Sequence, residues 1–222
     1  MTFATEFIVS LFAGILTLFV ILDPIGALPF FQAFTIDLSD KERNKLAQRS
    51  VLIAMGLLLV FAYLGALILN LLGIGIYDFE VAGGLLLLIF ALRDALFSEP
   101  LGAKETTSAK ERVASVNKTR MLDTIAVIPI ATPLLAGPGS LTTVMLLTQS
   151  KQGFEGLIIG GVAILVDCGL ALAAFRMSGK LNKWIGPSGL LIIGKVMDIL
   201  MAAIAVSYLF HGIQGIVQVT GL

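Results

Sequence analysis

Charge is scarce in this chain of 222 residues. Only 14% of the residues are Asp, Glu, Lys or Arg, whereas about 25% is usual for a soluble globular domain. Apolar residues make up 57% of the chain. The 15 basic and 15 acidic residues cancel, so no strongly basic surface favours nucleic acid as a partner. This composition excludes an ordinary soluble domain and predicts a protein that lies in a lipid bilayer.

Cysteine and histidine are each present once, as Cys168 and His211. A single cysteine cannot form an internal disulfide or a pair of catalytic thiols, and a single histidine cannot build a histidine-based metal cluster. No other spacing of side chains indicates a metal site or a catalytic centre. We therefore expect no enzymatic activity, no bound metal and no cofactor.

The chain contains several long apolar runs. A helix that crosses a bilayer needs about 20 apolar residues. We predict an all-α, polytopic membrane protein with six transmembrane segments, at residues 7–34, 51–72, 79–97, 122–147, 154–175 and 186–210.

Basic residues alternate from one connection to the next. Of the 15 Lys and Arg residues, 13 lie in or beside the connections after the first, third and fifth segments, and one, Lys151, lies after the fourth. Lys and Arg mark the cytoplasmic side of a membrane protein. The pattern therefore predicts that both termini lie on the non-cytoplasmic side.

The two halves of the chain show an internal repeat. Pro24 and Pro129 are 105 residues apart, as are Gly84 and Gly189, and four aliphatic residues follow each of these glycines. Three segments per half is an odd number, so the second half has to enter the membrane from the opposite side. The predicted parts are a first three-helix repeat at 1–97, a cytoplasmic linker loop at 98–121 and an inverted second repeat at 122–222.

Proline and glycine are concentrated at two places inside apolar runs, residues 22–29 and residues 129–139. Proline lacks the N–H group that continues a helix, and lipid cannot satisfy the backbone groups that are freed. One such place alone is more often a structural kink. A pair at matching places in two halves is the feature that points to a transporter's binding site. We predict broken helices in the first and fourth segments.

Each interruption exposes backbone groups that complement a zwitterion. N–H groups at the start of a half-helix can bind a carboxylate, and carbonyl groups at the end of one can bind an ammonium group. Asp23 offers a carboxylate for an ammonium group, or a cap for the half-helix that follows. Thr142 and Thr143 add hydroxyl groups near the second interruption. The predicted substrate-binding residues are Asp23, Pro24, Gly26, Pro29, Thr132, Pro133, Gly137, Pro138 and Gly139.

The ionisable side chains well inside the predicted segments are Asp23, Asp167, Lys195 and Asp198. A charge at the centre of a bilayer costs about 2.5–3.5 kcal/mol, so it seldom lacks a role. Lys195 and Asp198 are three residues apart on one helical face and are expected to neutralise each other. Asp167 has no local partner. It bonds to a neighbouring helix, pairs with Lys195 or takes up a coupling proton, and Asp198 is the second candidate for that proton. Glu80 and Asp94, nearer the ends of the third segment, are interpreted as interface anchors.

The two interrupted stretches resemble two motifs of one family. Residues 22–31, Leu-Asp-Pro-Ile-Gly-Ala-Leu-Pro-Phe-Phe, are similar to the first-segment motif of the MarC/SnatA family. Residues 131–139, Ala-Thr-Pro-Leu-Leu-Ala-Gly-Pro-Gly, are similar to its fourth-segment motif. Length, six segments and a polar loop between the halves extend the resemblance over the whole chain. The resemblance implies an inner-membrane transporter of small neutral amino acids, typified by glycine and alanine, and it carries over all nine predicted binding residues.

We therefore predict a secondary transporter that moves a small neutral amino acid across the inner membrane by alternating access. Its partners are the substrate, the lipid bilayer and, as a candidate coupling ion, the proton. The alternative is an efflux carrier for drugs or hydrophobic metabolites, which predicts a wide, aromatic pocket. Other members of the family are named for multiple antibiotic resistance, but the resemblance does not turn that association into a drug-efflux activity. A passive channel is a further alternative, which a counterflow measurement separates from a carrier.

Overall fold

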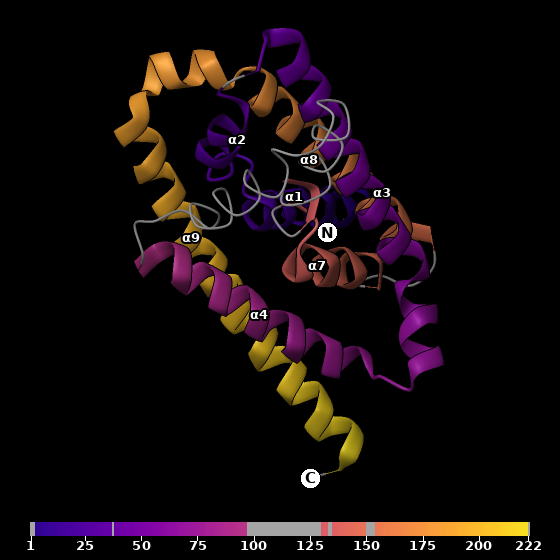
Figure 1. The fold of residues 1–222 in the computed structure, drawn as a ribbon. Helices are drawn as coiled ribbons and strands as arrows, with labels where there is room; N and C mark the ends of the chain where they lie inside the picture. Colours follow the sequence, from indigo (N-terminus) through magenta and orange to yellow (C-terminus); the bar gives the residue numbers. More distant parts are fainter. Residues whose placement is uncertain (1–2, 37, 97–129, 133–134, 150–153, 222) are drawn as a thin grey trace.

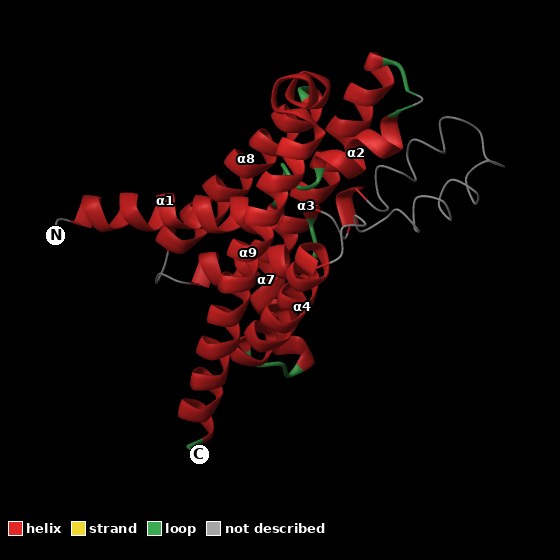
Figure 2. Ribbon diagram, turned by 90° about the vertical axis from the view of Figure 1, so that its left-hand side faces the viewer, coloured by secondary structure: helices red, strands yellow, loops and turns green. Residues whose placement is uncertain are grey.

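Helices make up all regular structure in the part of the chain that the computed structural model describes, residues 3–36, 38–96, 130–132, 135–149 and 154–221. No strand is present within these ranges (Figure 1 and Figure 2). The prediction of an all-α protein is therefore confirmed. The predicted linker loop, 98–121, and one predicted binding residue, Pro133, lie outside the described residues.

The helices in chain order are α1 (Phe3–Leu22), α2 (Leu28–Thr35), α3 (Asp40–Leu72), α4 (Ile76–Leu96), α7 (Pro138–Gln149), α8 (Phe154–Arg176) and α9 (Ser178–Thr220). Four helices are long and apolar enough to cross a membrane: α1, α3, α8 and the part Ser188–Thr220 of α9. Helix α4 matches the predicted third segment but carries Asp78, Glu80, Arg93 and Asp94. Helix α7 has 12 residues, and most of the predicted fourth segment before it is outside the described residues.

Helix α3 begins eleven residues earlier than the segment predicted from apolar residues alone, at Asp40 rather than at Val51. Ser39 and Glu42 form a capping box: the Ser39 hydroxyl accepts from the Glu42 N–H, and the Glu42 carboxylate accepts from the Ser39 N–H at 3.0 Å. The helix ends at Gly73, whose φ of 70° suits glycine. Its 33 residues span about 50 Å, against about 30 Å for a hydrocarbon core. The polar first turns therefore extend beyond the apolar layer.

Helix α9 is divided by Gly186, whose φ of 76° and ψ of 163° are not helical. Residues 178–185 form a short arm, and the long part that follows begins where the sequence predicted the sixth segment. Only glycine adopts this positive φ without strain. The bend sets the direction of the long part of α9, which runs alongside α4 (Figure 1).

Small residues let α4 and α9 pack closely and antiparallel. A Cβ atom added at Gly84 would lie 3.0 Å from the backbone oxygen of Ala205 and from Cβ of Tyr208. One added to Gly212, further along α9, would lie 3.0 Å from the backbone oxygen of Tyr77. Backbones approach this closely in membranes where an interface residue has no side chain. Gly84 therefore serves the close packing of α4 against α9.

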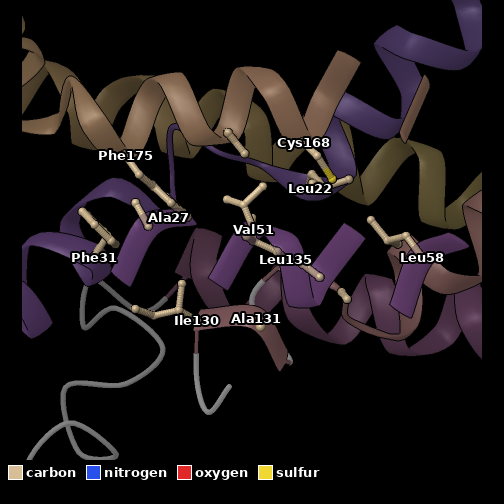
Figure 3. Packing of buried hydrophobic residues seen from close by; sticks show 14 of the residues in the cluster. Leu22, Ala27, Phe31, Val51, Leu58, Ile130, Ala131, Leu135, Cys168 and Phe175 are labelled. Atoms are coloured by element: carbon tan, nitrogen blue, oxygen red, sulfur yellow. The ribbon is translucent and has the colours of Figure 1, made fainter. Parts of the chain in front are cut away.

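The main buried cluster joins α1, α2, α3, α7, α8 and the stretch before α7 (Figure 3). Its fully buried large side chains include Leu22, Phe31, Leu58 and Phe175. The outward faces of the long helices carry exposed apolar residues, such as Phe12, which is 63% exposed. An apolar outer surface around a packed interior is what a bilayer environment requires.

Candidate functional site

The first interruption lies between α1 and α2. The Asp23 N–H group makes the last helical hydrogen bond, to Phe19 O at 3.0 Å. Asp23 then adopts a φ of 40°, and no other non-glycine residue of the described chain has a positive φ. Aspartate reaches this region more readily than most residues because its short side chain can bond locally. Pro24 follows with no N–H group to offer, so the helix cannot continue.

Asp23 also closes the turn that it begins. Its Oδ1 accepts from the Gly26 N–H at 3.0 Å, and its backbone oxygen accepts from the Ala27 N–H at 3.0 Å. A side chain on Gly26 would run into the Asp23 carboxylate. The predicted role of Asp23 as the cap of the half-helix that follows is not realised, because the N-cap of α2 is Ala27, without a side-chain hydrogen bond. Asp23 instead closes the turn that precedes α2. Pro29 lies at the start of α2, where a missing N–H group costs nothing.

Several backbone groups at this interruption have no hydrogen-bond partner among the described residues. The carbonyl groups of Val20, Ile21 and Leu22 would normally accept from the residues four positions later. Those donors fail in turn: Pro24 has no N–H group, the Ile25 N–H group makes no hydrogen bond to a described residue, and the Gly26 N–H group goes to Asp23. Among the described residues, the end of α1 therefore leaves three carbonyl oxygens without a donor, and the turn leaves one N–H group without an acceptor.

At the second interruption, residues 130–132 and 135 have π-helical backbone, and a bend follows at Ala136. The Ala136 N–H group donates to Ala131 O at 2.9 Å, a bond between residues five apart. Gly137 lies in the extended link before α7, which begins at Pro138. The Ser140 hydroxyl donates back to Leu135 O at 2.8 Å. The backbone here departs from the α-helix within residues that the sequence singled out.

Helix α7 packs its first turns directly on α4. A Cβ atom on Gly139 would meet the Leu87 side chain, and one on Gly83 would meet Thr142. The hydroxyls of Thr142 and Thr143 donate to Pro138 O at 2.9 Å and Gly139 O at 2.8 Å. The hydroxyl groups of these two threonines therefore donate to backbone oxygens of their own helix, and their hydrogens are not available to a ligand.

The flanks of the two interruptions belong to one buried cluster. Leu22, Ala27 and Leu28 border the first interruption, and Ala131 and Leu135 belong to the second. Figure 3 shows the labelled Leu22, Ala27, Ala131 and Leu135 within one packed region. The structure thus brings together two stretches that are more than one hundred residues apart in sequence.

A group of charges surrounds the first interruption. Asp23 interacts electrostatically with Asp198 on α9 and with Asp94 on α4, and Asp94 and Asp198 also interact with each other. Lys195 and Asp198 attract each other electrostatically, in line with the prediction that they neutralise each other, but their side chains form no salt bridge in the described part of the chain. Lys195 Nζ instead donates to the backbone oxygens of Asp94 and of Ala95, the latter at 3.1 Å. Residue spacing along one helix could not show that the end of α4 lies nearer.

Asp94 is a member of this group that the sequence reading missed. It was interpreted as an interface anchor, but one of its carboxylate oxygens is buried and without a partner. Glu80 is likewise not an exposed anchor, since it is only 7% exposed. It interacts electrostatically with His211 and with Tyr208, whose hydroxyl donates to Thr143 Oγ1 at 3.0 Å. The antiparallel packing of α4 on α9 places the end of α4 beside Lys195, and no pattern along the sequence indicated it.

Asp167 stands apart from these charges on α8. Its side chain is fully buried, and neither carboxylate oxygen has a hydrogen-bond partner. Two of its three predicted roles, a bond to a neighbouring helix and a pair with Lys195, are therefore not realised in this structure. Across the described ranges, no cluster of three or more His, Cys, Asp or Glu side chains could hold a metal ion.

Comparison with known proteins gives consistent matches along almost the whole chain. The family described as MarC family integral membrane protein matches residues 8–217. A UPF0056 membrane protein of Methanocaldococcus jannaschii is 33% identical over 199 residues, which cover 90% of this chain and 93% of the relative. The UPF0056 membrane protein YhcE of Escherichia coli is 29% identical, over 90% of this chain and 89% of the relative. No solved structure gives a significant match. This chain therefore belongs to the MarC family of integral, multi-pass membrane proteins.

Proposed function

We propose that this protein is a secondary transporter that moves small neutral amino acids, such as glycine and alanine, across the inner membrane by alternating access. One observation carries the proposal: the interruptions at 23–27 and 130–137 contribute their flanks to the same buried cluster. Irregular backbone at membrane depth is tolerated where it meets protein or a ligand cavity, and transporters place their substrate there.

The packing of the helices supports an inverted repeat of six segments. Helix α2, which follows the first interruption, packs on α8 and α9, whereas α7, which follows the second, packs on α3 and α4. Helices α3 and α8 pack on each other, as do α4 and α9. Exchanging α2 with α7, α3 with α8 and α4 with α9 leaves these pairs unchanged, although the packing of α7 on α8 has no counterpart between α2 and α3. A two-fold relation between the halves would account for the pairs that are shared, and the alternating basic connections separately favour both termini on the non-cytoplasmic side.

The chemistry of the interruptions supports a zwitterionic substrate. In the turn at 23–27, the Ile25 N–H group and three carbonyls at the end of α1 have no partner among the described residues, and the Asp23 carboxylate lies beside them. The start of α7 adds the N–H groups that every helix leaves without intrahelical partners. The substrate's carboxylate and ammonium groups would find complements within one region, while Gly26, Gly137 and Gly139 present no side chains there.

Transport by the purified protein in liposomes tests the proposal. Vesicles that contain the protein and internal unlabelled L-alanine should accumulate external labelled L-alanine or glycine faster than empty vesicles. This counterflow requires a carrier cycle, so it excludes a passive channel. Competition by hydrophobic drugs in place of amino acids would favour the efflux alternative. Verified insertion with no amino-acid flux would contradict the proposal.

We further propose that protons couple to transport through Asp167, because a fully buried charge without a partner is costly and a neutral, protonated form removes that cost. Asp167→Asn should accumulate L-alanine equally with and without a pH gradient, since an amide releases no proton, and it should retain counterflow. Glu155→Gln in the first turn of the same helix is the control and should keep the gradient dependence. Unchanged gradient dependence in both Asp167→Asn and Asp198→Asn would end the idea of carboxylate-coupled transport.

A further inference from the structure

The first eight residues of α9, 178–185, form an arm that runs across one end of the molecule before the bend at Gly186 (Figure 1). Ser178 is 1% exposed, and Leu181, one turn later, packs against the main buried cluster. The Gln32 side chain of α2 donates to the Ser178 backbone oxygen at 3.0 Å. These contacts fix the inner face of the arm to the body of the protein.

The outer face of the arm carries two cations and an indole ring. Lys180, Lys183 and Trp184 are three and four residues apart, so their side chains lie on one side of the helix. All three are exposed, and Trp184 is 82% exposed. Tryptophan is enriched where a bilayer meets water, and lysine side chains near helix ends reach the headgroups. The outer face of the arm therefore suits the headgroup layer of a membrane.

Basic residues outnumber acidic residues at the end of the molecule that carries the arm. Residues 176–185 contain three basic residues and no acidic residue, and residues 40–49, at the start of α3, contain four basic and two acidic residues. At the opposite end, residues 70–80 and 211–221 contain no Lys or Arg. Charge complementarity therefore favours an anionic partner at the end with the arm.

Arg43 lies where the start of α3 meets the arm. A Cβ atom on Gly179 would lie 3.7 Å from Arg43 Nη1, so the guanidinium group faces backbone that carries no side chain. Arg43 Nη1 pairs with Asp40 Oδ1 at 3.5 Å, but the Asp40 side chain is 93% exposed, and such a pair contributes little.

Two hydrogen-bonding groups at this meeting point have no partner. The Arg43 Nε–H group and the Ser178 hydroxyl are both buried, and neither forms a hydrogen bond in the described part of the chain. Buried donors are normally satisfied. An acceptor is therefore missing where α3 meets the arm.

We infer that Arg43 and the arm form a binding site for the phosphate group of an anionic phospholipid. The Arg43 guanidinium offers paired N–H donors in one plane, which match phosphate oxygens, and Lys180 and Lys183 add positive charge. The site lies at one end of the long apolar helices, where headgroups are present, and Trp184 suits the boundary between headgroups and acyl chains. A lipid bound here would hold the arm in the headgroup layer. The bend at Gly186 would then fix the direction in which the long part of α9 enters the bilayer.

The melting temperature of the purified protein in detergent tests the site with three additives. Phosphatidylglycerol carries a phosphate group and a net negative charge, phosphatidylcholine carries the same phosphate group without a net charge, and inorganic phosphate is the free anion. A ligand that binds the folded state raises its melting temperature. Phosphatidylglycerol well above its Kd should raise it by about 5 °C, whereas the other two should raise it by less than about 1 °C.

Substitutions then locate the effect. Arg43→Gln should weaken phosphatidylglycerol binding about tenfold, because the charged pair of donors is lost. Arg43→Lys keeps the charge without the planar pair of donors, so its affinity should be intermediate. The double variant Lys180→Gln, Lys183→Gln should bind more weakly, and its affinity should depend less on salt. Lys41→Gln is the matched control and should bind like the original protein. It removes a cation from the same turn of α3, but two residues from Arg43 its side chain points to the opposite side of the helix.

Each contrary result has a distinct meaning. Equal stabilisation by phosphatidylcholine and phosphatidylglycerol would show that lipid acts only on the apolar surface, and an equal effect of inorganic phosphate would make the ligand a free anion. Either result would overturn the lipid site. A loss of affinity in Lys41→Gln as large as in Arg43→Gln would show a diffuse basic surface and would also overturn it. If Arg43→Gln does not fold, unchanged affinity in both Arg43→Lys and the double lysine variant would contradict the proposal. These measurements use lipid binding alone, so they neither require nor test the proposed transport.

Discussion

Gly26→Ala is expected to reduce L-alanine transport to the level of empty vesicles. A methyl group at this position would run into the Asp23 carboxylate. The side chain of Asp23 would have to move, and the 3.0 Å bond from the Gly26 N–H group to its Oδ1 would be lost. Losing a hydrogen bond to a charged acceptor costs about 1.5–3 kcal/mol, and a changed turn displaces the carbonyls at the end of α1. The loss of transport activity should therefore be larger than the loss of stability alone would cause.

Two measurements separate these effects of Gly26→Ala. The melting temperature in detergent should fall by about 5–10 °C, as expected for a loss of about 2–3 kcal/mol in a chain of this size, while the protein still inserts and elutes as one species. Gly56→Ala on α3 is the matched control, because a Cβ atom there meets nothing within 4 Å. It should be neutral or slightly stabilising, since alanine favours a helix. Wild-type transport in Gly26→Ala would show that the turn plays no part in the carrier cycle.

The position of this turn could be predicted from sequence because its cause is local. Pro24 removes a donor wherever it stands in an apolar run, and the helix does end at Leu22. The hydrogen bond with which Asp23 closes the turn is also local, since it joins residues three positions apart. Ser39 and Glu42, which form the capping box, are likewise a local signal for the start of α3. The apolar residues alone place the start of this segment at Val51 instead.

The partners of the buried charges could not be predicted because their causes are not local. Lys195 and Asp198 share a helical face, yet Lys195 bonds to carbonyls that end another helix. The spacing of residues along α9 cannot show that the end of another helix lies within reach of Lys195. The burial of Glu80 and the isolation of Asp167 likewise depend on which helix covers them. Spacing along the chain gives candidates for a site, and packing between helices decides which of them meet.

Phe175→Ala is expected to give the largest loss of stability among single substitutions in the described core. Phe175 on α8 stacks on Phe31 of α2, with ring centroids 4.5 Å apart and an angle of 3° between the rings. Both side chains are fully buried. Replacing a buried phenylalanine by alanine costs about 3–5 kcal/mol, so the melting temperature should fall by about 10 °C or more. Phe12→Ala provides the control, because Phe12 is 63% exposed on the outer surface and should lose little.

The stack between Phe31 and Phe175 also tests how the two halves are joined. Helix α2 follows the first interruption, and α8 belongs to the other half of the chain, so the two rings connect the turn at Asp23 to the opposite repeat. Phe31→Ala and Phe175→Ala remove the same contact, and the double variant should therefore lose less stability than the two single variants added together. Additive losses would mean that each ring packs independently against the cluster. A non-additive loss accompanied by impaired counterflow would place this contact at the surface along which the halves move during alternating access.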